Sequence, residues 1–290
     1  MKTRTRKIEL KVVAAAPVTR RARPLRWDCP ALARLMWLGA FGASWGVTPA
    51  LALDDAAPHG APTVAVTAAP AALSAPVRKA NFGQERASPD ARHVADWVID
   101  ARDNRGLPFA IVDKVDAKVY VFYADGRLRG TAPVLLGLAV GDDSVPGIGQ
   151  RKLASILPEE RTTPAGRFVA DLDKDLHGKQ MLWVDYDGAI ALHPVVTSNA
   201  EERRAERLAS SSIQDKRISY GCINVPADFF KHVVSPAFTK TSGIVYVLPE
   251  TRSPQKVFAS YDVDDRARAL QARQADAGLP AQLAAQAGAN

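Results

Sequence analysis

Residues 217–226 read Arg217-Ile218-Ser219-Tyr220-Gly221-Cys222-Ile223-Asn224-Val225-Pro226. Cys222 is one of two cysteines in the 290-residue chain, and the other, Cys29, lies in a segment that we expect to be removed. Because a lone thiol cannot close an internal disulfide, Cys222 needs another role. Gly221 permits a sharp backbone turn, and a helix predicted to begin at Pro226 places the positive end of its dipole near the thiol, which favours the thiolate. The stretch is therefore typical of a cysteine enzyme.

The first 52 residues have the pattern of a secretory signal peptide. Basic residues are frequent up to Arg26, an apolar segment runs from Ala31 to Val47, and small residues lead to Ala52. We expect cleavage after Ala52. Since the apolar segment contains Arg34 and is short for a membrane span, an uncleaved anchor is the less favoured alternative, and the mature chain should have no span.

The net charge of +7 belongs to this targeting segment. Residues 1–52 hold 10 of the 38 Lys and Arg residues and 2 of the 31 Asp and Glu residues, so 28 basic and 29 acidic residues remain in the mature chain. A basic protein would suggest a nucleic-acid partner, and removal of the segment excludes that argument. Export also implies an oxidising compartment, where a single unpaired thiol is either buried and inert or reactive.

Composition divides the mature chain into four parts. Residues 53–87 are rich in Ala and Pro without a period, which is typical of a disordered spacer. Ser88, followed by a proline and an acidic residue, predicts a capped helix within 88–106 that packs on the following domain. Residues 107–250 form the candidate catalytic domain, and residues 251–290 form a partly helical tail that we expect to be peripheral.

The candidate catalytic domain is predicted to be mainly β. Asp125-Gly126 is a strong hairpin-turn signal, and no repeat of 20–50 residues is present, which excludes solenoids and propellers. The runs rich in β-branched and aromatic residues are 109–112, 118–123, 133–138, 167–170, 181–184, 189–192 and 244–248.

A cysteine nucleophile needs a base, which is normally a histidine. His193 follows the apolar run 189–192, and Pro194 stops the strand, so its imidazole is expected at a strand tip. A histidine in that setting is more often structural, but a Gly-Cys turn downstream makes catalysis the favoured interpretation. A zinc site built from His193 and Cys222 is disfavoured, since the usual close ligand spacing is missing.

A charged segment at 199–210 separates His193 from Cys222. It begins like a capping box and carries Arg203, Arg204 and Arg207. Two interpretations stay open: a solvated surface helix, or a lid whose arginines meet a carboxylate of the substrate.

These residues together resemble a known family. His193, separated by 28 residues from the cysteine of Ser219-Tyr220-Gly221-Cys222-Ile223-Asn224, resembles the signature of the L,D-transpeptidase (YkuD-type) catalytic domain. A hairpin at 112–126 and the run Thr163-Pro164-Ala165-Gly166-Arg167-Phe168 support the likeness, which covers 107–249, about half of the chain. It implies an L,D-transpeptidase-like β-sandwich with a few flanking helices.

The resemblance also implies roles for individual residues. Cys222 would attack the carbonyl after the third residue of a peptidoglycan stem tetrapeptide. His193 would take and return the proton, with its other nitrogen held by a backbone carbonyl. The N–H groups from Tyr220 to Cys222 would form the oxyanion hole. The candidate oxyanion or substrate-binding residues are Ser219, Tyr220, Gly221, Asn224 and Arg217.

The family implies a cell-wall function in the periplasm or cell envelope, with no metal or organic cofactor. An amine from a second stem, a D-amino acid or a lipoprotein would resolve the thioester, whereas water would make the protein an L,D-carboxypeptidase. Two features depart from the family pattern: Tyr220 stands where histidine is usual, and the gap between His193 and Cys222 is longer than usual. A non-catalytic cell-wall-binding module is therefore a further alternative.

Overall fold

The computed structural model describes residues 75–287, with side chains described to residue 275. The predicted signal peptide and the first part of the predicted spacer lie outside these residues. The helices are α2 (Pro89–Ala101), α3 (Arg204–Ala209), α4 (Ala227–Phe229), α5 (Ser235–Phe238), α6 (Pro254–Phe258) and α7 (Val263–Ala287). The strands are β1 (Phe109–Asp113), β2 (Lys118–Phe122), β3 (Leu128–Pro133), β4 (Leu136–Gly137), β5 (Gly166–Lys174), β6 (Gln180–Asp185), β7 (Ile190–Pro194), β8 (Arg217–Ser219), β9 (Ile223–Val225) and β10 (Gly243–Val247).

Eight strands form one mixed sheet in the order β3-β2-β1-β10-β5-β6-β7-β9, and β4 pairs with β8. The pairs β1–β10, β7–β9 and β4–β8 are parallel, and the other pairs are antiparallel. The prediction of a mainly β fold is confirmed.

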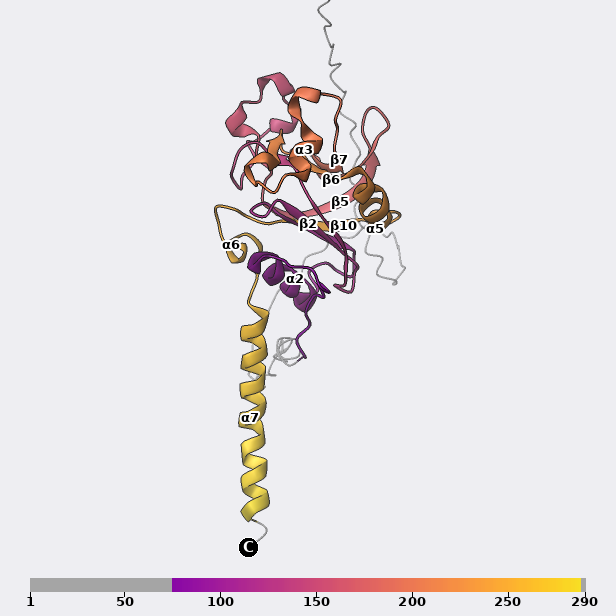
Figure 1. The fold of residues 1–290 in the computed structure, drawn as a ribbon. Coiled ribbons are helices and arrows are strands. Elements are labelled where there is room, and N and C mark those ends of the chain that lie inside the picture. Colours follow the sequence, from indigo (N-terminus) through magenta and orange to yellow (C-terminus); the bar gives the residue numbers. More distant parts are fainter. Residues whose placement is uncertain (1–74, 288–290) are drawn as a thin grey trace, which may run out of the picture. The chain divides into compact units, whose positions relative to one another are not determined.

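Strand β5 joins two layers of this sheet. Residues 166–170 of β5 pair with β10, and residues 171–174 pair with β6. Alternate residues of β1, β2 and β10 on one side, and of β6, β7 and β9 on the other, belong to a single buried core, so the sheet folds over on itself as a sandwich. Figure 1 shows the β6–β7 layer with α3 on one side of the β2–β10 layer and α2 on the other. The shared core includes Val112, Val121, Val247, Leu182, Leu192 and Ile223.

A second core lies between α2 and the outer face of β1, β2 and β10. Ser88 caps α2, since its Oγ accepts the N–H of Ala91 at 3.1 Å, and Pro89 occupies the first turn as predicted. Trp97 of α2 packs edge-on against Tyr246 of β10 at 6.3 Å between ring centroids. This core fixes the β1–β10 layer and leaves the other layer to carry the candidate site.

One predicted boundary was wrong, and the tail packs more closely than predicted. The spacer was expected to extend to residue 87, but Phe82 is buried and edge-on to Tyr120, and Asn81 pairs with Arg127, so the chain is folded from at least this point. The tail is less peripheral than expected, because Phe258 joins the second core. The tail has few apolar side chains, but Phe258 and Val263 can pack because strands β1, β2 and β10 supply the rest of this core. Among residues 75–287, no helix is both long and apolar enough to cross a membrane.

Candidate active site

Cys222 lies in a tight loop between two short strands. The loop joins β8 to β9, and neither strand was predicted. Ser219 Oγ donates to the carbonyl of Cys222 at 2.6 Å and accepts the N–H of Gly221 at 3.1 Å. The next helix, α4, starts after β9 with Pro226 as its N-cap residue, so Cys222 does not adjoin a helix N-terminus. The helix-dipole argument for the thiolate is therefore wrong.

Gly221 is required by the packing of this loop. Its φ is +128°, and a Cβ at this position would lie 2.6 Å from Ile190 Cδ1 and 2.8 Å from the Thr162 carbonyl oxygen. The hydroxyl of Thr163 donates to the Gly221 carbonyl at 2.8 Å and accepts the N–H of Gly137 at 2.8 Å. The loop is thus held from outside by a fully buried threonine. Since the Gly221 N–H is bonded to Ser219, Tyr220 and Cys222 are the remaining N–H candidates for an oxyanion hole.

His193 stands on β7 beside this loop. Strands β7 and β9 are parallel neighbours, with His193 in register with Asn224. The His193 Nδ1 lies 2.8 Å from the carbonyl oxygen of Pro194, so that a backbone carbonyl holds one ring nitrogen. The Asn224 amide nitrogen lies 3.4 Å from His193 Nε2 and 3.4 Å from the Cys222 carbonyl oxygen. Sheet pairing therefore brings the predicted base and the end of the cysteine loop together.

Burial favours the neutral form of both candidate catalytic groups. Burial raises the pKa of the Cys222 thiol, although a backbone contact with Ala191 and the charge of Arg204 act in the opposite direction. Burial also lowers the pKa of His193. The thiol donates to the carbonyl of Ala189 at 3.7 Å. Both shifts favour the uncharged forms, a thiol and a neutral imidazole.

Tyr220 lies against a cation. The Arg161 guanidinium is centred 4.0 Å from the Tyr220 ring centroid, and its NH2 group donates to the Ile156 carbonyl at 3.2 Å. This is a close cation–π contact. Tyr220 therefore packs the cysteine loop against the segment that precedes Thr162.

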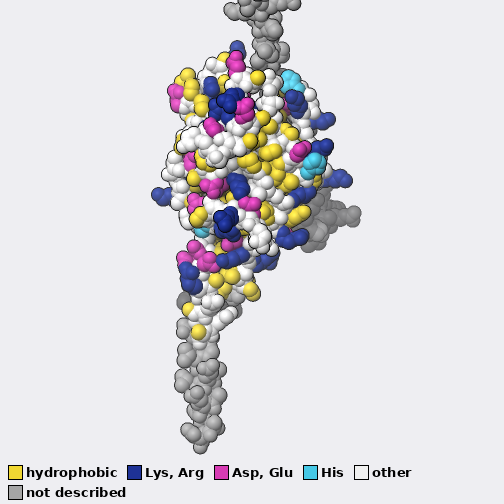
Figure 2. Space-filling model, in the orientation of Figure 1, with side chains coloured by type: hydrophobic (Ala, Val, Ile, Leu, Met, Phe, Trp, Pro, Cys, Tyr) yellow, Lys and Arg dark blue, Asp and Glu magenta, His cyan; other side chains and the backbone are white. Residues whose placement is uncertain are grey.

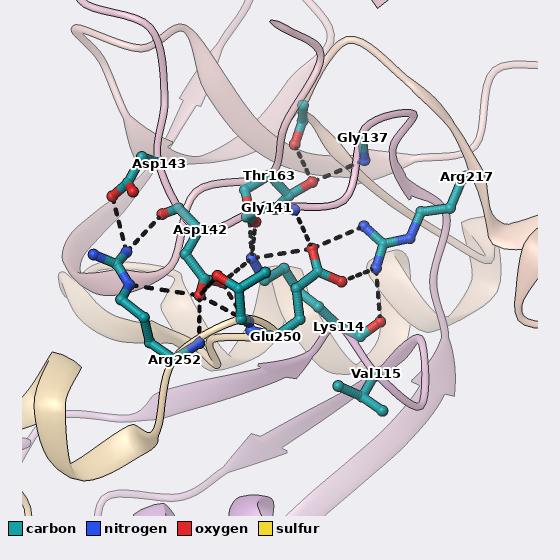
Figure 3. A network of polar contacts seen from close by, with 12 residues as sticks. Lys114, Val115, Gly137, Gly141, Asp142, Asp143, Thr163, Arg217, Glu250 and Arg252 are labelled. Atoms are coloured by element: carbon teal, nitrogen blue, oxygen red, sulfur yellow. Dashed lines mark hydrogen bonds and ion pairs between the residues drawn. The ribbon is translucent and has the colours of Figure 1, made fainter. Parts of the chain in front are cut away.

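Arg217 is held by residues of this chain. Its guanidinium forms an ion pair with Glu250 and donates to the Lys114 carbonyl at 3.1 Å. This geometry does not support the predicted substrate contact. Figure 3 shows the arginine at one end of a network centred on Lys114, whose side chain is fully buried and lies 2.8 Å from Asp142 and 3.4 Å from Glu250.

The network reaches the cysteine loop through Thr163. Lys114 Nζ donates to the Thr163 carbonyl at 3.0 Å, and the hydroxyl of the same threonine holds Gly221. Arg217 links the network to the loop along the chain, because it begins β8, two residues before Ser219. We use the name ion network for Lys114, Asp142, Glu250 and Arg217.

The sequence of residues 108–238 matches the family model described as the L,D-transpeptidase catalytic domain, YkuD. This segment belongs to the YkuD family. The resemblance inferred from the His193 and Cys222 motifs is thereby confirmed. Among curated proteins, none matches the chain.

Solved structures of a helical-cell-shape-determining protein and of several L,D-transpeptidases are similar to parts of the chain. The cell-shape-determining protein Pgp2 from Campylobacter jejuni (K307A mutant) is 16% identical, with a TM-score of 0.36 over 57% of this chain and 52% of that one. An L,D-transpeptidase from Xylanimonas cellulosilytica is 16% identical, with a TM-score of 0.31 over 49% and 60%. The Enterococcus faecium L,D-transpeptidase catalytic domain is 16% identical, with a TM-score of 0.30 over 49% and 96%. The chain thus spans about half the length of the Campylobacter protein.

The long gap of this YkuD domain between His193 and Cys222 forms a folded insert, residues 195–216. It contains a 3₁₀ turn, Ala200–Glu202, and then α3, with Arg203 in the left-handed conformation between them. Arg203 is exposed and pairs with Glu206. Arg204 instead turns inward, and its NH1 group donates to the Asn224 side-chain oxygen at 2.7 Å. The solvated-helix interpretation fits Arg203 and fails for Arg204.

A cleft of about 950 Å³ opens beside His193. The β5–β6 hairpin, the segment after β7 and the residues following α4 form its walls. Figure 2 shows hydrophobic side chains gathered on this face of the molecule, with Lys, Arg and His side chains around them. His193 is among the lining residues, and Cys222 is not. The lining is Asp175, His177, Lys179, Gln180, Met181, His193, Pro194, Val195, Val196, Thr197, Ser198, Phe230, Lys231 and Ser235.

Sequence reasoning missed two groups that shape the YkuD site. Thr163 is part of the motif at residues 163–168, but nothing near it in the sequence indicates that its hydroxyl joins Gly137 to Gly221. Arg204 was noted among three arginines, and periodicity within so short a helix could not distinguish it from Arg203. Among the described residues, no three His, Cys, Asp or Glu side chains gather as metal ligands would.

Proposed function

We propose that this chain is an exported cysteine acyltransferase, an L,D-transpeptidase that acts on peptidoglycan stem tetrapeptides through a thioester on Cys222. Membership of residues 108–238 in the YkuD family supports a role in the cell wall. The observation that carries the finer proposal is the pairing of β7 with β9, which sets His193 beside the Asn224 end of the cysteine loop.

The first half-reaction starts from the neutral pair. The thiol turns from the Ala189 carbonyl toward His193 Nε2 and passes its proton there, while Sγ bonds to the carbonyl carbon of the third stem residue. The Tyr220 and Cys222 N–H groups receive the developing oxyanion. Collapse of the tetrahedral intermediate breaks the bond to the terminal D-alanine, whose amine leaves with the proton from His193.

The second half-reaction reverses these roles. An acceptor amine attacks the thioester carbon and gives a proton to His193, the C–S bond breaks, and the thiolate recovers that proton. The cleft is our candidate site for the acceptor. His193 lines it, and the attacking amine must give its proton to the imidazole of that residue. The apolar walls of the cleft, with Lys179 and Lys231 among the lining residues, suit a peptide that carries carboxylates.

Export belongs to the same proposal. The basic, apolar and small-residue regions of residues 1–52 support secretion to the periplasm or cell envelope, where stem peptides are exposed. The unpaired state of Cys222 in such a compartment fits a reactive group.

The test uses the purified full chain with disaccharide-tetrapeptide, with and without an added D-amino acid, analysed by mass spectrometry beside Cys222→Ala. We expect a cross-link between third residues, or an exchanged terminal residue, that the variant does not form. Loss of D-alanine without either product would make the protein an L,D-carboxypeptidase. Binding of peptidoglycan by both proteins, with no product from either, would contradict catalysis and favour a binding module.

A further inference from the structure

We propose that Arg204, supplied by the insert 195–216, is a positioning residue of the active site that acts through Asn224 on His193 and Cys222. This inference rests on the function proposed above, since it concerns the same two catalytic groups. It assigns a task to the segment that lengthens the gap between them.

Arg204 is held in one direction. Its side chain is 13% exposed, and its Nε forms an ion pair with Glu202 at 2.5 Å while its NH1 group donates to Asn224 at 2.7 Å. Asn224 is fully buried. A guanidinium fixed at two points in this way directs its charge and its donors into the site instead of into solvent.

The insert that carries Arg204 is itself fastened at several points. Arg207 donates to the Glu202 carbonyl at 3.0 Å and to the Asp215 carbonyl at 3.3 Å. Lys216 is buried, and its ammonium donates to the Leu208 carbonyl at 2.8 Å, which satisfies the C-terminal end of α3. These bonds are internal to the insert, so Arg204 is delivered to Asn224 by a folded element.

The contact with Arg204 fixes which way the Asn224 amide faces. A guanidinium has donors and no acceptor, so the Asn224 oxygen must face it and the amide N–H₂ must face His193. A donor at 3.4 Å from Nε2 requires that nitrogen to be the unprotonated one, with the ring proton on Nδ1 directed at the Pro194 carbonyl. This is the tautomer that can accept the thiol proton.

The positive charge of Arg204 lowers the pKa of both His193 and Cys222. The charges that face His193 are Arg204 and Lys179, which lower its pKa, and Asp175, which raises it, after the larger effect of burial. Arg204 is the charge that acts on Cys222, where it lowers the thiol pKa against burial. Loss of the arginine should therefore raise the pKa of the thiol and of the imidazole.

The experiment compares Arg204→Ala with Arg203→Ala in the full chain. Arg203 is the matched control, because it adjoins Arg204 on the same insert but is 70% exposed and paired with Glu206. The first measurement is the rate of alkylation of Cys222 by iodoacetamide across pH, read on the Cys222 peptide by mass spectrometry so that Cys29 does not contribute. The second is kcat/KM for acyl transfer, including Asn224→Ala and the double variant.

Arg204→Ala should move the midpoint of the alkylation profile upward by about half a unit to one unit. It should lower kcat/KM by roughly tenfold to a hundredfold, the cost of losing a charged hydrogen bond. Arg203→Ala should stay within about twofold of the unsubstituted chain, as exposed ion pairs contribute little. Arg204→Lys should restore the midpoint but not the full rate, since an ammonium lacks the planar fork. In the double variant, removal of Arg204 should add little to Asn224→Ala.

Identical behaviour of Arg204→Ala and Arg203→Ala would overturn the inference. A lower rate with an unmoved profile, and with effects that add to those of Asn224→Ala, would also overturn it and leave Arg204 a merely structural residue. The alkylation profile needs no peptidoglycan. If it shifts as expected while the unsubstituted chain forms no acyl-transfer product, the proposed function fails and the positioning inference stands.

Discussion

The backbone of Gly221 is the feature on which the position of Cys222 depends most directly. The loop combines a φ of +128° with close approaches to Ile190 and to the Thr162 carbonyl. Sequence reasoning predicted a sharp turn here from the glycine alone. It could not predict that the carbonyl of the same residue is held by Thr163, because that contact joins residues 58 positions apart.

Gly221→Ala should therefore impair both stability and acyl transfer. A methyl group 2.6 Å from Ile190 Cδ1 and 2.8 Å from a backbone oxygen forces the loop to shift, with a loss of about 1–3 kcal/mol in the free energy of unfolding. Chemical denaturation and the acyl-transfer rate measure the two effects.

Gly178→Ala is the control for Gly221→Ala. Gly178 has a φ of +76°, but nothing lies within 4 Å of the position that an added methyl group would take, so it reports the conformational cost without a clash. Equal losses in the two variants would contradict the account of the cysteine loop.

The pKa of the Cys222 thiol also depends on a few individual residues around it. The helix-dipole expectation failed because β9 intervenes between Cys222 and α4, and a three-residue strand has too weak a pattern to be recognised in sequence. Burial raises the pKa of the thiol, and the positive charge of Arg204 lowers it. Tyr220, which departs from the family pattern, is accommodated by its contact with Arg161.

The ion network joins four elements beneath the loop. It links the end of β1, the loop at residues 141–142, the start of β8 and the residues after β10. Burial alone would raise the pKa of Asp142, but hydrogen bonds from Lys114, from the Thr251 hydroxyl and from the Glu250 and Thr251 N–H groups more than offset this and hold that pKa well below its usual range.

The sign of the pH dependence follows from that shift. A carboxyl whose pKa is lower in the folded state stabilises the fold fully above its unfolded value, near pH 4, and loses this contribution as pH falls toward the folded value. Asp142→Asn should lower the free energy of unfolding at pH 7 by about 3 kcal/mol, because a buried charge loses its partner. It should also flatten the decline in stability below pH 4.

Asp143→Asn is the matched control for this prediction. Asp143 adjoins Asp142, but its side chain is 82% exposed and contacts Arg252 at the surface. Denaturation curves from pH 3 to 7 should separate the two variants. A decline in acid that is unchanged in Asp142→Asn would show that the ion network does not set it.

At the scale of the whole molecule, the long strands were predictable and the short ones were not. The runs at 109–112 and 244–248 are β-branched and aromatic, and they match β1 and β10 closely. The run at 133–138 was predicted as one strand, whereas β3 ends at Pro133 and β4 begins at Leu136. Strands β8 and β9 are fixed by pairing with β4 and β7, which is tertiary and leaves no local signal.

The same division holds for the candidate site. Residue types with intrinsic chemistry, Cys222 and His193, could be selected from the sequence, and so could the glycine of the turn. The direction of Arg217 into the ion network and of Arg204 into the site could not, because both depend on partners far away in the chain.

The most direct test of the central claim is to trap the thioester itself. The full chain is mixed with disaccharide-tetrapeptide without an acceptor amine, quenched in acid and digested, and the Cys222 peptide is examined by mass spectrometry. We expect a mass increase equal to the disaccharide-tripeptide acyl group on Cys222, absent from Cys222→Ala and formed far more slowly by His193→Ala. Release of D-alanine with an unmodified Cys222 that persists at every time point, or an acyl group on another residue, would contradict it.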